Sequence, residues 1–88
     1  MIVTAINEYK HEISVNDFFA KSPEFMYNEK LVDQTTRILK VLLRHPNEVE
    51  EIADKIGEKY IFSVFGAYRT YKIVFVINKQ SIVLIDIW

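Results

Sequence analysis

The sequence of 88 residues contains no cysteine, only two glycines, two prolines and two histidines. Without cysteine the chain forms no disulfide and offers no thiolate, and a cytoplasmic location is the simplest expectation. No apolar run reaches the roughly 18 residues that a membrane-spanning helix needs, and the first residues lack the basic segment that opens a secretory signal. We therefore expect a single cytoplasmic domain over residues 1–88, with no membrane partner.

The scarcity of glycine and histidine excludes several kinds of site. Gly57 and Gly66 are isolated, so the sequence contains neither a phosphate-binding loop nor a dinucleotide-binding fingerprint. His11 and His45 are far apart, and no His, Asp and Glu residues have the spacing of metal ligands. The nucleophile motif of the α/β-hydrolases is also missing. We predict neither a metal ion nor another cofactor.

Apolar and aromatic residues are abundant instead. Half of the residues are hydrophobic, and six phenylalanines, five tyrosines and one tryptophan are present, as expected of a folded domain. The net charge of −1 is unevenly spread: residues 1–54 hold six Lys or Arg and ten Asp or Glu, whereas residues 55–88 hold five and two. The basic C-terminal part favours a nucleic acid or an acidic partner, although an acidic helical layer explains the same asymmetry.

Residues 59–88 are the densest in β-branched and aromatic side chains, which favour strands. Turn signals at Gly66-Ala67 and at residues 78–80 divide this stretch, which predicts an antiparallel meander of strands 59–65, 68–77 and 81–88. Side chains alternate between the two faces of a strand. One face of the middle strand is expected to carry Arg69, Tyr71, Ile73, Phe75 and Ile77, and the other Thr70, Lys72, Val74 and Val76.

Such a sheet needs a cover, which the first half of the chain has to provide. Residues 2–6 are a short strand-like run. Ser14 then opens an S-x-x-D pattern that predicts a short helix over residues 15–21, with Phe18 and Phe19 facing inward.

Ser22-Pro23 is a helix start, and His45-Pro46 is a helix end, so we predict a long helix over residues 23–44. Phe25, Met26 and Tyr27 are consecutive, so one or two of them should be exposed or meet a partner, unless they cluster under the preceding helix. The inward stripe is expected to comprise Leu31, Val32, Thr35, Ile38, Leu39, Leu42 and Leu43.

Residues 47–56 are predicted as a further short helix, with Asn47 and Glu50 as a capping pair and Gly57 just past its end. Its inward residues would be Val49, Ile52 and Ile56. The resulting order is β-α-α-(α)-β-β-β, an α+β fold in which helices cover one face of a small antiparallel sheet.

This order and three local patterns resemble the RelE/ParE superfamily of toxins from type II toxin–antitoxin systems. The patterns are the helix end ILKVLLRHP (residues 38–46), the strand entry IGEKY (56–60), and the strand pair TYKIVFVI (70–77) and IVLIDIW (82–88). The resemblance implies a growth inhibitor with a role in plasmid stabilisation, held by a cognate antitoxin. Lys72 stands where the family usually has arginine, and the charge is near neutral. Both features favour a ParE-like binder of DNA gyrase, or a diverged or inactive member, over a RelE-like nuclease acting on ribosome-bound messenger RNA.

In the nuclease alternative, Arg69, Lys72 and Tyr71 are the candidate catalytic residues, because cations stabilise a charged transition state and tyrosine transfers protons. The candidate binding residues are Lys59, Tyr60, Tyr68, Lys79 and Trp88, because cations grip phosphates and aromatic rings stack on bases. The opposing interpretation is that these tyrosines pack in the sheet and the cations are solvated strand ends.

Two further alternatives remain open. The chain could be a non-catalytic interaction module or a nucleic-acid-binding domain of the same fold. The last strand, if it lies at an edge, offers backbone groups for strand addition, and a homodimer is a further expectation.

Overall fold

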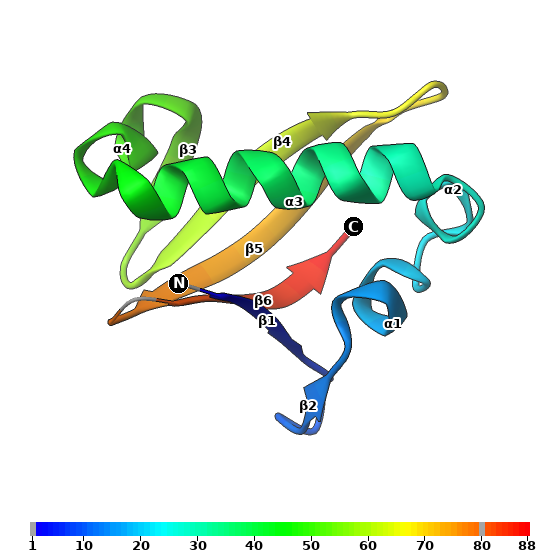
Figure 1. The fold of residues 1–88 in the computed structure, drawn as a ribbon, viewed down its shortest axis with the longest axis horizontal. Helices are drawn as coiled ribbons and strands as arrows, with labels where there is room; N and C mark the ends of the chain where they lie inside the picture. Colours follow the sequence, from blue (N-terminus) through cyan, green and yellow to red (C-terminus); the bar gives the residue numbers. More distant parts are fainter. Residues whose placement is uncertain (1, 80) are drawn as a thin grey trace.

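The computed structural model describes residues 2–79 and 81–88, in which helices lie on one face of a six-stranded sheet (Figure 1). The α+β class is therefore as expected. The helical segments are α1 (Val15–Phe19), α2 (Pro23–Met26), α3 (Glu29–Arg44), the 3₁₀ turn η1 (Pro46–Glu48) and α4 (Val49–Ile52). The strands are β1 (Ile2–Ile6), β2 (Glu12–Ile13), β3 (Ala53–Ile56), β4 (Lys59–Phe65), β5 (Thr70–Asn78) and β6 (Ser81–Ile87). Gln80, the last residue of the predicted second turn, lies outside the described residues.

The sheet has the order β2-β1-β6-β5-β4-β3. The predicted meander is confirmed as β4, β5 and β6, although β5 begins at Thr70 and ends at Asn78. β1 runs parallel to β6, with Ala5 opposite Leu84. Consequently β6 is an interior strand, and the expectation that it could lie at an edge is wrong.

The predicted alternation along β5 is also confirmed. Tyr71, Ile73 and Phe75 face the helices and are buried in the main core, whereas Val74, on the opposite face, does not belong to that core. A bulge interrupts the pairing with β6 between Val74 and Phe75. Such an extra residue bends a strand and increases its twist.

Helix α1 begins as the sequence predicts, because the Ser14 Oγ accepts a hydrogen bond of 3.0 Å from the Asp17 N–H. It ends at Phe19 rather than at residue 21. Phe18 and Phe19 are buried. The Phe19 ring stacks on Phe25, with centroids 5.0 Å apart, so α1 and α2 share one aromatic core.

The long helix predicted over residues 23–44 is broken into α2 and α3. Asn28 starts the second piece: its backbone is non-helical, and its side chain accepts a 3.1 Å hydrogen bond from the Leu31 N–H. Asparagine favours this capping position because its side chain competes with the helical backbone bonds. Ser22 makes no side-chain cap, and its buried Oγ has no hydrogen-bond partner among the described residues.

The inward face of α3 is as predicted except at one position, and Leu31 and Leu43 also pack against the core. Its buried residues are Val32, Thr35, Leu39 and Leu42. Ile38, expected in the core, is 42% exposed. It lies about 100° round the helix from Leu39, which is enough to move it to the edge of the stripe.

The helix predicted over residues 47–56 is half wrong. It ends at Ile52, and the remainder is β3, an edge strand paired with β4. Gly57, with φ +64°, stands in the turn between these strands rather than after a helix. The predicted Asn47 and Glu50 capping pair does not form, because Glu48 takes the N-cap position without a side-chain bond.

The burial of this segment differs accordingly. Val49 is buried as predicted, whereas Ile52 and Ile56 are 49% and 62% exposed. β3 is an edge strand, so its outer side has no neighbouring strand among the described residues. Across residues 2–79 and 81–88, no helix combines the length and apolarity that crossing a membrane requires.

Candidate functional surfaces

The side chains of the three candidate catalytic residues do not lie together in one site. The Arg69 guanidinium lies 4.5 Å from the centroid of the Tyr71 ring. Tyr71 is only 7% exposed, and its ring contacts Phe25 on the inner side, with centroids 5.0 Å apart. Lys72 points to the opposite face, where its Nζ donates a 2.6 Å hydrogen bond to the Ser63 Oγ.

The candidate binding residues are also divided between the two ends of the meander. Tyr68 is 91% exposed in the turn between β4 and β5. Lys59 begins β4 and Lys79 follows β5, so both lie toward the other end. Tyr60 is half-buried, with its ring stacked on Phe75 at 5.4 Å. The predicted basic and aromatic patch is therefore two separate surfaces.

Trp88, the remaining candidate, extends the pairing of β6 with β5. Its N–H donates to the Lys72 carbonyl at 3.0 Å, and its own carbonyl accepts from the Lys72 N–H at 2.8 Å. Ser63 is opposite Lys72 on the other side. Residues directly opposite in an antiparallel sheet share a face, so Trp88, Lys72 and Ser63 form one row on the face without helices.

Phe65 also belongs to this surface, although it was not among the predicted site residues. It lies two residues beyond Ser63 on the same face of β4 and is 81% exposed. We use the name hairpin surface for the four residues Phe65, Tyr68, Lys72 and Trp88. An aromatic residue next to a predicted turn indicates a possible binding residue. The alternation of β4 alone, however, does not show which face of the sheet the helices leave uncovered.

Glu24 attaches the tip of this hairpin to α2. Its carboxylate accepts hydrogen bonds from the N–H groups of Ala67, at 3.1 Å, and Tyr68, at 3.3 Å. Gly66 makes this approach possible, because a Cβ at that position would overlap the Glu24 carboxylate and lie 2.8 Å from the Tyr71 ring. The turn that carries Tyr68 is thus held against the helical layer.

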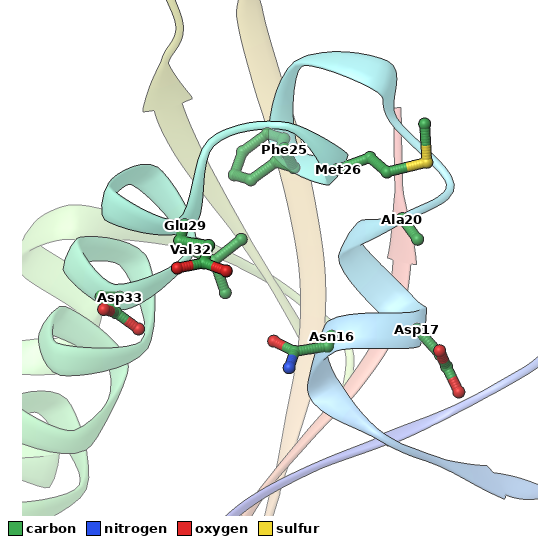
Figure 2. Close-up of a pocket in the computed structure, with 8 residues that line it drawn as sticks. All are labelled: Asn16, Asp17, Ala20, Phe25, Met26, Glu29, Val32 and Asp33. Carbon is green, nitrogen blue, oxygen red and sulfur yellow. The ribbon is translucent and has the colours of Figure 1, made fainter.

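A crevice of about 520 Å³ opens between α1, α2 and the beginning of α3 (Figure 2). It is lined by Asn16, Asp17, Ala20, Phe25, Met26, Glu29, Val32 and Asp33. Three carboxylates give the crevice a negative charge, which repels phosphates. Within the described part of the chain, no group of three or more His, Cys, Asp or Glu residues could hold a metal ion.

A second hollow lies beside the turn between β1 and β2, next to the last residues of β6. It measures about 710 Å³ and is lined by Ile6, Asn7, Glu8, Lys10, Lys21, Lys59, Ile85 and Asp86. Lysines and carboxylates are mixed in this lining, so the hollow has no strong preference for one sign of charge. Lys59 lines this hollow, whereas Tyr68 and Arg69 do not.

A groove of about 290 Å³ runs between α3 and α4, and we call it the α3–α4 groove. Its lining comprises Arg37, Ile38, Val41, Leu42, Glu48, Glu51 and Ile52. The apolar pattern of the sequence did not predict this groove, because it places Ile38 and Ile52 in the core. Exposed Ile38, Val41 and Ile52 make the groove mainly apolar.

No protein-family model, curated protein or solved structure matches the chain. Its likeness to the RelE/ParE superfamily therefore rests on the order of elements and on the local sequence patterns alone.

Proposed function

We propose that the protein is a ParE-like toxin of a type II toxin–antitoxin system, which inhibits growth by binding a macromolecular target and is neutralised by a cognate antitoxin. The order of elements supports this proposal: a first strand, a helical layer and then the meander of β4, β5 and β6 is the order that the resemblance implies. The additional strands β2 and β3 extend the two edges of the sheet.

The hairpin surface is the observation that carries the proposal. Phe65, Tyr68 and Trp88 are 81%, 91% and 52% exposed. Aromatic residues are among the types enriched where proteins bind one another. Because Glu24 holds the turn in place, these side chains are presented on a fixed hairpin, which lowers the entropy lost on binding.

Binding is better supported than cleavage. A general acid or base has to reach the proton that it transfers. The ring of Tyr71 is buried against Phe25, and Lys72 lies on the other face of the sheet from Arg69. The net charge of −1 also disfavours a phosphate-rich substrate, so DNA gyrase ranks ahead of ribosome-bound messenger RNA as the target.

The proposal is tested by induced expression in a bacterial host, with growth, messenger RNA integrity and DNA supercoiling measured together. We expect growth arrest with altered supercoiling and intact messenger RNA. The double variant Phe65→Ser/Tyr68→Ser should relieve the arrest, because it removes the two most exposed aromatic side chains of the surface. Tyr9→Ser is the matched control, because Tyr9 is 72% exposed in the turn between β1 and β2.

The outcomes separate the alternatives. Arrest with cleaved messenger RNA, lost in the Arg69→Gln/Lys72→Gln variant, would establish the nuclease instead. Absence of arrest by a folded, soluble wild-type protein would refute the toxin assignment and favour an interaction module. Circular dichroism of each purified variant verifies that its fold is kept.

A further inference from the structure

The α3–α4 groove is an apolar surface that the proposed function does not use. Ile38 and Val41 on α3 and Ile52 on α4 are 42%, 52% and 49% exposed, and buried Leu42 forms the floor between them. Three large aliphatic side chains gathered in one groove are costly to leave in water. A groove of this kind indicates a partner.

The charges at the groove are of both signs. Arg37 lies on the α3 side, whereas Glu48 and Glu51 come from the segment of η1 and α4. Among the described residues, the single ion pair joins Lys55 to Glu50 at 3.7 Å, so neither Arg37 nor these two glutamates is paired there. The surface thus presents a cation, an apolar centre and two anions.

We infer that the occupant of this groove is a second copy of the same chain, placed by a two-fold axis. In a two-fold interface the same patch is used twice, so the patch has to complement itself. Here Ile38 and Val41 pack against Ile38 and Val41 of the second copy. Arg37 of each copy then faces Glu48 and Glu51 of the other, so each cation lies beside opposite charges.

The dimensions are compatible with such an interface. Helix α3 has 16 residues, so it offers a contact about 24 Å long. A stable interface buries about 800 Å² on each partner, so the contact has to extend beyond the groove along the exposed side of α3. The hairpin surface comes from β4, β5 and the chain end instead, so the dimer does not depend on the proposed function.

Analytical ultracentrifugation over a concentration series in the micromolar range tests the dimer. Wild-type protein should sediment as a dimer. The Ile38→Glu/Val41→Glu variant should raise the dimer dissociation constant by at least about 100-fold, since it places charges in the apolar centre. Tyr9→Glu, at an exposed residue elsewhere, is the matched control and should leave the constant unchanged.

A charge exchange distinguishes a second copy from any other occupant. Arg37→Glu alone and Glu48→Arg/Glu51→Arg alone should each weaken the dimer by about tenfold, because like charges then face each other twice. Mixing the two variants should restore assembly, since every reversed charge in the mixed dimer faces an opposite charge. Labelling one variant with a fluorophore measures the mixed species directly.

A monomeric wild type in this concentration range would overturn the inference. So would a dimer that keeps its affinity in the folded Ile38→Glu/Val41→Glu variant, or a mixture of charge variants that assembles no better than its components. Because sedimentation requires no toxicity, failure here leaves the proposed function untouched, and failure of the growth assay leaves the dimer untouched.

Discussion

The two faces of the sheet are built from the same strands and have different surroundings. On the face that the helices cover (Figure 1), Ile73, Phe75, Ile82 and Leu84 are completely buried. On the open face, their neighbours along the same strands are mostly half-buried, as Val76 and Val83 are. Alternation sorts the side chains into two sets, and only the helical layer decides which set becomes the core.

The open face nevertheless contains one side chain that is nearly buried. Val74 is 6% exposed although it is not part of the main core. Its cross-strand neighbours are Ile61 on one side and Asp86 on the other. Cross-strand side chains alone can therefore cover a central residue, and low exposure does not by itself identify the helix-covered face.

The largest expected effect comes from truncating the covered face. Phe75→Ala should lower the free energy of unfolding by about 4 kcal/mol, because it removes a fully buried ring and leaves a cavity. Val76→Ala, the adjacent residue on the open face, should cost only about 1 kcal/mol. Urea-induced unfolding of both variants measures the difference, and similar losses would mean that the two faces are equally covered.

A smaller effect is expected where the covered layer meets the hairpin. Gly66→Ala should destabilise the fold by about 2 kcal/mol, since the added Cβ displaces the Glu24 carboxylate and crowds Tyr71. In a Glu24→Ala background the same substitution should cost clearly less. Thermal unfolding of the four proteins forms a double-mutant cycle, and strict additivity would show that Glu24 does not hold the turn.

Gly57→Ala is the matched control for this cycle. A Cβ at Gly57 would meet nothing within 4 Å, although its φ of +64° disfavours alanine. Its cost of about 1 kcal/mol should therefore be independent of Glu24.

The local signals of the sequence predicted the meander, its two faces, the start of α1 and the end of α3. They failed where tertiary contacts decide. Residues 53–56 continue a charged segment that favours a helix. They form β3 instead, because β4 offers an unpaired edge. Glycine adopts positive φ both after a helix and in a hairpin turn, so Gly57 in the sequence does not distinguish a helix end from a turn.

The candidate surfaces were harder to predict than the fold. Tyr71 and Arg69 share a face, as the alternation indicates, and Lys72 lies on the other. The separation of Lys59 from Tyr68 follows from the predicted meander itself, because Lys59 starts its first strand and Tyr68 lies at the turn after that strand. The α3–α4 groove could not be predicted because Ile38, at the margin of the predicted apolar stripe, is 42% exposed.

The smallest expected effect on stability comes from a substitution on the open face of the sheet. Lys72 donates to the Ser63 Oγ at 2.6 Å on a face without helices. Because a partly solvated lysine contributes little to stability, and methionine retains much of its apolar stem, Lys72→Met should change the free energy of unfolding by less than about 0.5 kcal/mol. A loss of several times this size in urea-induced unfolding would show that the open face also contributes structurally. With a neutral result, Lys72 is available for binding, and any effect of the variant on growth arrest then reports contact with the target.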